Sequence, residues 1–275
     1  MLKRLLDTLG LGEVGIPQSL WDLALNELTF VRRLAGTADP EFRRLCGRLL
    51  ATKVMTGAGG LQLTAPIQIN LAVQACLPIQ HLGIDWYRGW SGIVVYPSEF
   101  RADRRVQDES GLVHEFSETV AGESWDGGPV IVSWPDADHG SGAPEFAFNV
   151  VIHEFAHKLD LLNGEADGLP HLDRRLHAGL DPGRWRQILD EAFDRFNAAL
   201  DLIELQLPDH VDPESSAADA YYARLPLDPY AAQDTAEFFA VSSEAFFVEP
   251  SRLREAFPAW YGLLSDFYRQ DPLAG

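Results

Sequence analysis

One short pattern restricts the folding of this chain more than any other: His153-Glu154-Phe155-Ala156-His157, an H-E-x-x-H motif. Positions i and i+4 point from one face of an α-helix, so the motif brings its two imidazoles together only within a helix. Residues 146–162 are mostly apolar and lack Pro and Gly, and Asn163-Gly164 then provides a left-handed stop. We therefore predict a helix from Phe146 to Leu162, buried around most of its circumference.

Two imidazoles in a buried helix need partners, because an unpaired buried polar group costs about 1–3 kcal/mol. A zinc ion held by His153 and His157 satisfies both. A catalytic zinc site has three protein ligands and leaves a fourth position for water. The extended motif that supplies a third histidine fails here, because its glycine and histidine positions hold Asp160 and Asn163. The third ligand must come from elsewhere, and a carboxylate on a later helix is favoured.

Three carboxylates are candidates for a place at this site. Glu237 follows Asp234 by three residues at the start of an apolar helix, but this spacing also fits a capping box, in which the glutamate only bonds backbone N–H. The residues alone do not choose between the two. Glu244 is favoured as an interior or solvated carboxylate rather than a ligand. Asp160 is either an acceptor for an imidazole N–H or the partner of a nearby cation.

The remaining histidines and the two cysteines show no ligand spacing. Cys46 and Cys76 lie among apolar residues, which favours two buried thiols over a disulfide. The other histidines are expected at the surface or with satisfied ring nitrogens; they are His81, His114, His139, His171, His177 and His210.

The charge of the chain narrows its partners. Its formal charge is −19, from 41 acidic and 22 basic residues, which repels nucleic acid phosphates and anionic lipid headgroups. We expect no nucleic acid and no membrane as partner, and a basic or neutral peptide as the easier ligand. Asp7 interrupts the signal-like start of the chain, and no stretch approaches the ~18 apolar residues of a membrane helix. The expectation is a cytoplasmic protein.

The order of patterns along the chain predicts an α+β fold. Helix-like spacing covers residues 18–34, 40–54 and 66–77, and short β-branched runs at 93–96, 112–114 and 130–134 look like strands of one small sheet. We expect one domain over 1–275, with a helical N-terminal part (1–85), a small central mixed sheet (86–145) and a helical zinc-binding part (146–275).

With these residues placed, the sequence resembles the Mlc titration factor A family of metallopeptidases. Residues 151–160 with Asn163-Gly164 resemble the active-site helix of that family, and residues 228–237 resemble its second motif. Shorter matching segments are spread along the chain; they are Gln74–Pro78, Gly122–Trp125, Gly128–Val130, Phe267–Tyr268 and Asp271–Pro272.

The resemblance implies a zincin-like, gluzincin-like fold, distantly related to the catalytic domain of anthrax lethal factor. It also implies one Zn²⁺ held by His153, His157 and Glu237, with Tyr230 close to the metal, and an aminopeptidase-like activity. Enterobacterial members of the family bind the transcriptional repressor Mlc, so a repressor of that type is a further candidate partner. Thr235 stands where the family commonly has proline; either residue suits the first turn of a helix.

These residues suggest a mechanism and two rival functions. Glu154 lies about 100° round the helix from His153 and is expected to act as general base in peptide hydrolysis. Tyr230 is expected to donate to the developing oxyanion. Residues 130–134 are either an edge strand that pairs with a peptide substrate or an interior strand. One rival function is a repressor-sequestering protein in which the zinc is structural. The presence of Glu154 speaks against it, because a structural site is normally closed by four ligands and needs no base. The other rival is a zinc hydrolase that does not act on peptides.

Overall fold

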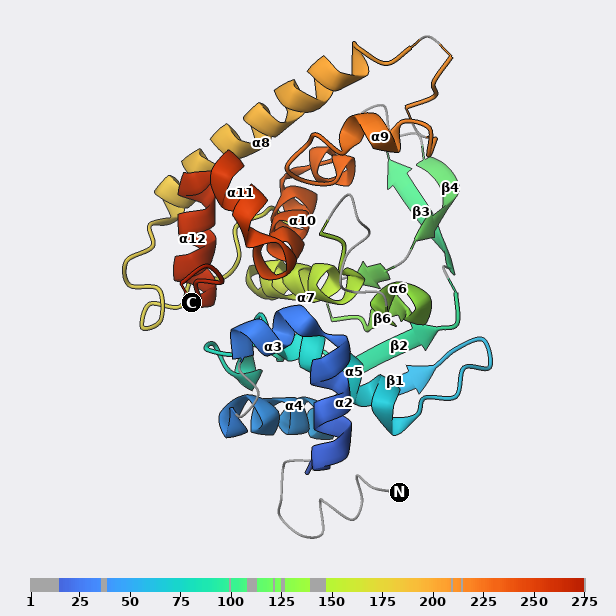
Figure 1. Ribbon diagram of the computed structural model, residues 1–275, viewed down its shortest axis with the longest axis vertical. Coiled ribbons are helices and arrows are strands. Elements are labelled where there is room, and N and C mark those ends of the chain that lie inside the picture. Colours follow the sequence, from blue (N-terminus) through green and yellow to red (C-terminus); the bar gives the residue numbers. More distant parts are fainter. Residues whose placement is uncertain are drawn as a thin grey trace.

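A computed structural model describes most of the chain. The described residues are 15–35, 39–98, 100–107, 113–120, 122–124, 127–138, 147–208, 210–213 and 215–274. Helix α7 (Val150–Asp160) lies in the middle of the molecule, with the N-terminal helices and a small sheet on one side and the C-terminal helices on the other (Figure 1). The predicted α+β class with a small central mixed sheet is confirmed.

The N-terminal part consists of helices with local start signals. They are α2 (Gln18–Glu27), α3 (Thr29–Ala35), α4 (Pro40–Thr52), α5 (Ala65–Cys76) and the 3₁₀ turn η1 (Ile84–Tyr87). In α4, the side chain of Asp39 accepts from the backbone N–H groups of Glu41 and Phe42, and Pro40 occupies the first turn. The helix predicted to reach Val54 therefore starts as expected but ends at Thr52.

Strand β1 (Val54–Gly57) was not predicted from the sequence. It pairs in parallel with β2 (Gly92–Tyr96), and the chain turns back immediately after it. A Cβ at Gly57 would lie 2.0 Å from the backbone oxygen of Leu61, so only glycine fits this turn. The cluster of glycines at 57–60 thus ends a strand rather than the preceding helix.

The main sheet has the strand order β1-β2-β6-β5. Strand β6 (Val130–Ser133) runs parallel to β2, and β5 (Gly122–Ser124) runs antiparallel to β6. Because β6 has a neighbour on each side, the alternative in which residues 130–134 form an edge strand is wrong. Trp134 lies outside the strand and begins the short helix α6 (Trp134–Asp138).

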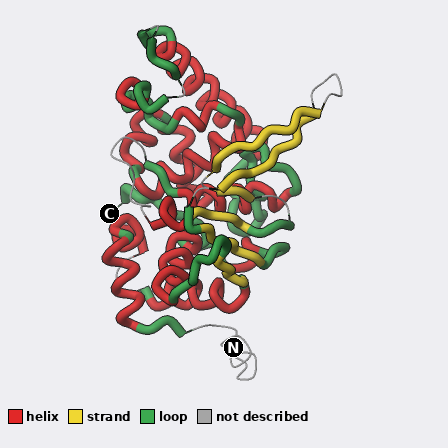
Figure 2. Tube along the Cα trace, turned by 90° about the vertical axis from the view of Figure 1, so that its right-hand side faces the viewer, coloured by secondary structure: helices red, strands yellow, loops and turns green. Residues whose placement is uncertain are grey.

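The run predicted at 112–114 does not belong to this sheet. Val113 begins β4 (Val113–Val120), which pairs antiparallel with β3 (Phe100–Gln107) as a separate two-stranded hairpin. The hairpin extends away from the helices (Figure 2). Leu112 lies outside the described residues. The prediction of one sheet was wrong because β-branched runs reveal strands but not their partners.

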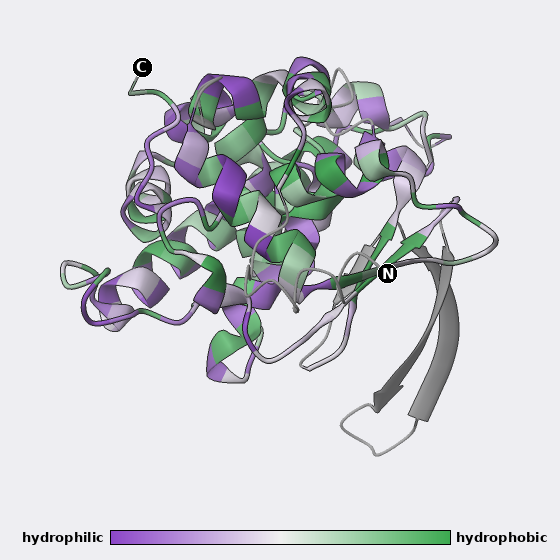
Figure 3. Ribbon diagram, turned by 90° about the horizontal axis from the view of Figure 1, so that it is seen from below, coloured by the Kyte–Doolittle hydropathy of each residue, from purple (hydrophilic) through white to green (hydrophobic). Residues whose placement is uncertain are grey.

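The C-terminal part is helical and contributes much of the core. Its elements are η2 (Leu161–Asn163), α8 (Pro182–Glu204), α9 (Asp219–Tyr222), η3 (Pro229–Ala232), α10 (Thr235–Val248), α11 (Pro250–Ala256) and α12 (Pro258–Tyr268). Hydrophobic residues gather inside the helical body and hydrophilic ones on its outside (Figure 3). None of the helices in the described part of the chain has the length and apolar character needed to cross a membrane.

Candidate metal centre

Helix α7 presents the two histidines of the motif. It begins at Val150 rather than at the predicted Phe146, which lies outside the described residues, because Asn149 caps it and accepts from the N–H of Ile152. The α-helix ends at Asp160, two residues before the predicted Leu162, and a 3₁₀ turn follows it. The predicted left-handed stop is confirmed, because Gly164 adopts a φ of 105°. All its residues except the two histidines are buried, and His153 and His157 are partly exposed on one face.

Helix α10 brings Glu237 to these histidines. Asp234 caps the helix, because its Oδ1 accepts from the N–H groups of Ala236 and Glu237 at 2.9 Å each. The carboxylate of Glu237 does not turn back to the cap. Its Oε2 lies 3.1 Å from Nε2 of His153 and 3.3 Å from Nε2 of His157. Asp234 therefore caps α10 as the capping-box pattern predicts, but Glu237 contacts the histidines of α7 instead of the cap.

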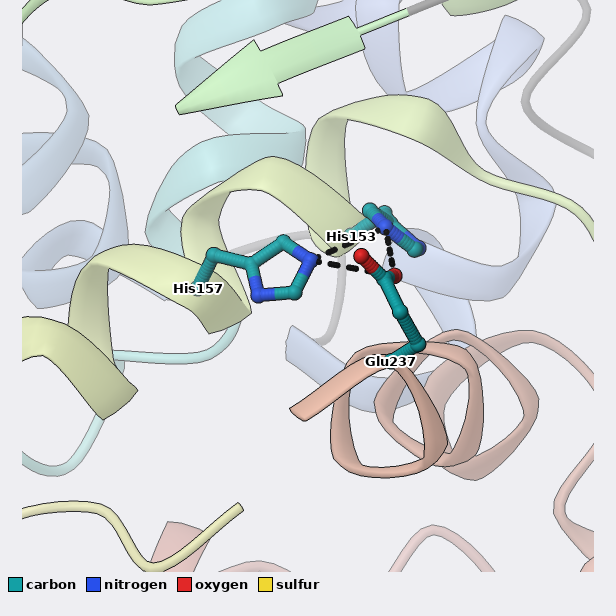
Figure 4. A group of neighbouring side chains, drawn as sticks. All are labelled: His153, His157 and Glu237. Carbon is teal, nitrogen blue, oxygen red and sulfur yellow. Dashed lines mark hydrogen bonds and ion pairs between the residues drawn. The ribbon is translucent and has the colours of Figure 1, made fainter. Parts of the chain in front are cut away.

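The three side chains form a group that fits a metal ion. Among the described residues, His153, His157 and Glu237 are the set of three or more potential ligands whose donor atoms lie close together (Figure 4). The two Nε2 atoms are 3.1 Å apart. Zinc bonds of about 2.0–2.1 Å at tetrahedral angles place neighbouring ligand atoms roughly 3.3 Å apart. The spacing, the donor types and three ligands from two helices therefore suit a catalytic zinc site.

Electrostatic coupling between the three groups is strong. Burial by itself would lower the pKa of His153, but hydrogen bonds to Glu237 and Glu244 outweigh it and raise that pKa well above its usual value. Burial likewise favours the neutral form of Glu237, but its bonds to His153 and His157 hold its pKa far below the usual range. Glu237 is thus a carboxylate, the form in which a glutamate can bind a metal ion.

Glu244 occupies the other side of His153. Its Oε1 lies 2.8 Å from Nδ1 of His153, and its Oε2 accepts from the backbone N–H of Asn149. A carboxylate oxygen accepts, so Nδ1 of His153 donates in this contact and Nε2 is the nitrogen that faces Glu237 and His157. Glu244 is 3% exposed and belongs to the site as a partner of the histidine. The sequence predicts an interior or solvated carboxylate here and misses the contact with His153. The seven-residue distance from Glu237, which places both glutamates on one face of α10, is the signal that could have found it.

The two residues expected to act in catalysis, Glu154 as general base and Tyr230 as oxyanion donor, lie next to this group. Glu154 is 3% exposed and interacts electrostatically with His153. The ring of Tyr230, on η3, has its centroid 6.0 Å from that of His153. Asp228 begins η3, and its Oδ1 accepts from the N–H of Tyr230 at 2.9 Å. Burial raises the pKa of Asp228 above its usual value, although the hydrogen bond from Tyr230 partly opposes this effect.

Asp160 and the other histidines have separate surroundings. Asp160 accepts from the N–H of Gly168 at 2.8 Å and interacts electrostatically with His157, while burial raises its pKa to about 7. His177 is 4% exposed; its Nδ1 accepts from the N–H of Asp173 and its Nε2 donates to the carbonyl of Phe267. The side chains of His114 and His139 lie outside the described residues.

Comparison with known proteins identifies the family. The family model for the glucose-regulated metallo-peptidase M90 matches residues 6–269. Mlc titration factor A of Klebsiella pneumoniae subsp. pneumoniae is 36% identical over 263 residues, 95% of this chain and 90% of that protein. The proteins of the same name from Yersinia enterocolitica and Salmonella gallinarum are each 36% identical, over 92% of this chain and 86% of theirs. Membership of a metallopeptidase family implies a divalent metal, for which the His-His-Glu group offers a site. The chain belongs to the glucose-regulated metallo-peptidase M90 family.

Proposed function

We propose that this chain is a zinc peptidase in which His153, His157 and Glu237 hold one Zn²⁺. The observation that carries the proposal is the convergence of their three donor atoms, 3.1–3.3 Å apart, from two helices. Two imidazoles and one carboxylate are a ligand set of catalytic zinc sites, whereas a purely structural site is normally closed by four ligands. The metallopeptidase family supports the same assignment.

Glu154 is the general base in this proposal. When bound, the zinc ion supplies a Lewis acid that polarises a carbonyl and lowers the pKa of water. Glu154 follows His153 on α7 and points about 100° away from it, so it approaches the site without joining the ligand group. Its carboxylate takes the proton of the attacking water and passes it to the leaving amine.

Tyr230 acts at the oxyanion. Its ring lies beside that of His153, and Asp228 holds the start of η3 by bonding the N–H of Tyr230. A phenol at this place donates a hydrogen bond to the oxygen that gains charge as the peptide carbonyl is attacked.

The first test is Glu154→Gln, which keeps the shape of the side chain and removes its basicity. Loss of a general base lowers turnover by typically 10²–10⁴-fold, and we expect zinc content to stay at one per chain. Metal analysis and a peptidase assay on the same preparations separate the two readouts. Unchanged turnover in Glu154→Gln would refute this mechanism. Glu237→Ala that still holds stoichiometric zinc would refute the ligand assignment.

The substrate class is a peptide, with aminopeptidase-like cleavage. The chain carries a net charge of −19, which favours cationic over anionic ligands, and a free α-amine is cationic near neutral pH. A matched pair of chromogenic peptides that differ only in N-terminal acetylation tests this choice. Faster cleavage of the free amine is expected; equal rates, or faster cleavage of the acetylated peptide, indicate an endopeptidase.

A second function is favoured by the names of the relatives. Three proteins at 36% identity are each called Mlc titration factor A. We propose that this chain binds a transcriptional repressor of the Mlc type in addition to its peptidase function. Titration of a labelled Mlc-type repressor with the purified chain and with Glu154→Gln tests it. Equal binding by both would separate this function from catalysis, and no binding by either would exclude it for that repressor.

We also propose a cytoplasmic setting. Cys46 and Cys76 are both free and buried, and they contact each other between α4 and α5. Neighbouring thiols of this kind suit a reducing compartment. Determination of free thiols in chain isolated under alkylating conditions checks the proposal; an oxidised pair would contradict it.

A further inference from the structure

Gln74 is a buried polar residue that the proposed mechanism does not use. It lies near the C-terminal end of α5 and is 0% exposed. Its Nε2 donates to Oδ1 of Asn70 at 2.7 Å and to the carbonyl of Ala137 at 3.1 Å, and its Oε1 accepts from Nδ2 of Asn149 at 2.7 Å. Buried polar groups are nearly always hydrogen-bonded, and Gln74 has three such partners. One of them, Asn149, caps α7, the helix that carries His153 and His157.

Asn149 connects Gln74 to three groups around the first turn of α7. Its Oδ1 accepts from the N–H of Ile152 at 2.9 Å, which caps the helix. Its backbone carbonyl accepts from the N–H of His153 at 3.0 Å. Its backbone N–H donates to Oε2 of Glu244. A single residue, 0% exposed, therefore contacts Gln74 on α5, the first turn of α7 and Glu244 on α10.

The hydrogen bonds between Asn149, Glu244 and His153 form a closed ring, called the circuit below, that includes a proposed zinc ligand. From Asn149, one path runs through its carbonyl to the backbone of His153. The other runs through Glu244 to Nδ1 of the same histidine, over 2.8 Å. The circuit fixes both the backbone of His153 and the direction of its ring. Because α5 packs against α7, Gln74 anchors the circuit to the N-terminal part of the molecule (Figure 1).

We propose that Gln74 and Asn149 are positioning residues for zinc binding, which act on His153 through Glu244. The inference rests on the proposed function only in taking His153 as a ligand. Metal affinity depends on the orientation of the ligand rings, and loss of an outer partner typically weakens binding 10–100-fold. The side chain of Asn70 continues the chain of contacts to Glu27 at 3.3 Å, so the network reaches the surface on α2.

The test measures zinc affinity of the full chain by competition with a chromogenic chelator. Gln74→Met keeps the length and volume of the side chain and removes its bonds. Asn149→Ser keeps a residue that caps helices well and removes the amide that reaches Gln74. We expect each variant to bind zinc about tenfold more weakly, and we expect the absorption bands of the Co²⁺-loaded chain to shift.

Ser243→Ala is the matched control. Ser243 is also 0% exposed on α10, but its hydroxyl bonds the carbonyl of Phe239 and the hydroxyl of Tyr268, away from His153. We expect it to lower the thermal midpoint and leave zinc affinity within twofold of the parent chain. Parent-like affinity and Co²⁺ spectra in both network variants would overturn the proposal. An equal loss of affinity in Ser243→Ala would also overturn it, because loosening of the fold would then explain the effect.

Coupling between the residues gives a second measure, and it keeps this inference separate from the peptidase proposal. If Gln74 acts through Glu244, the affinity losses of Gln74→Met and Glu244→Gln do not multiply in the double variant. Multiplying losses would show independent routes. A chain that binds zinc but cleaves no peptide would refute the proposed function and leave this inference standing. If the parent chain cleaves peptides but the Gln74 and Asn149 variants bind zinc normally, this inference is refuted and the proposed function stands.

Discussion

At the scale of single residues, the site is organised by two carboxylates on opposite sides of one imidazole. Glu237 and Glu244 are seven residues apart on α10, two helical turns, so both reach the same face of α7. The first lies 3.1 Å from Nε2 of His153 and the second lies 2.8 Å from its Nδ1. In the proposed zinc site, one helix thus provides both a ligand and the group that fixes the tautomer of another ligand.

Asp160 makes the stability of the metal-free chain depend on pH. Burial raises its pKa from 3.8 to about 7, so the folded state binds more protons than the unfolded state between these values, and stability falls as pH rises through them. Asp160→Asn keeps an oxygen that accepts from Gly168 and removes the charge. At pH 8 we expect Asp160→Asn to raise the free energy of unfolding by on the order of 2–4 kcal/mol over the parent chain. This difference between the two chains should shrink as the pH falls towards 4. Denaturant unfolding of zinc-free chain at several pH values measures this; a pH-independent difference would assign the titration elsewhere.

Gly168 joins the end of α7 to the start of α10. Its φ is +77°, and a Cβ there would lie 2.4 Å from the backbone oxygen of Thr235 and 2.9 Å from Cδ2 of Leu189. Gly168→Ala is therefore expected to cost more than the ~1–3 kcal/mol of left-handed strain alone. Gly164→Ala is the matched control, because Gly164 has a φ of +105° and nothing within 4 Å of its Cβ position. Equal losses of unfolding free energy in the two variants would show that the contacts of Gly168 do not matter.

At the scale of elements, the sequence predicts what is local and misses what depends on pairing. The spacing of His153 and His157, the apolar run around them and the stop at Gly164 are all local. The predicted helix therefore matches α7 except for its start, at Val150 rather than Phe146, and its last turn, which is a 3₁₀ turn. The place of Glu237 is not local, since it lies 80 residues from His157. Its pattern fits a cap as well as a ligand, and packing of α10 against α7 decides how its carboxylate lies.

The cap of α10 controls the direction from which Glu237 approaches. Asp234→Ala removes the acceptor for two N–H groups and is expected to cost about 0.5–2 kcal/mol of stability. Because Glu237 lies in the first turn that this cap holds, we expect weaker zinc binding as well. Asp39→Ala removes a cap of the same kind from α4 and serves as control. It should lower the urea midpoint by a similar amount and leave zinc affinity unchanged; loss of affinity in both variants would mean that general stability sets zinc binding.

At the scale of the whole molecule, the group of His153, His157 and Glu237 brings together parts that are far apart in the sequence. Helix α7 follows the sheet and α10 belongs to the C-terminal helices, and the three donor atoms connect only these two elements (Figure 4). Composition and periodicity predicted the order of helical and sheet regions. They did not predict the separate β3–β4 hairpin or the extra strand β1, because strand partners depend on contacts over the whole chain.

A ligand that binds only the folded state stabilises it by mass action, and this gives a global measure of the site. At free zinc 1,000 times the Kd, the gain is about 4 kcal/mol, which for a chain of this size corresponds to a rise in thermal midpoint of roughly 10 °C. We expect this rise in the parent chain and in Glu154→Gln, because Glu154 lies outside the ligand group. We expect it to be largely absent in Glu237→Ala, which breaks the connection between α7 and α10. Differential scanning calorimetry of chelated and zinc-loaded samples measures it, and an equal rise in Glu237→Ala would place the stabilising ion at a different site.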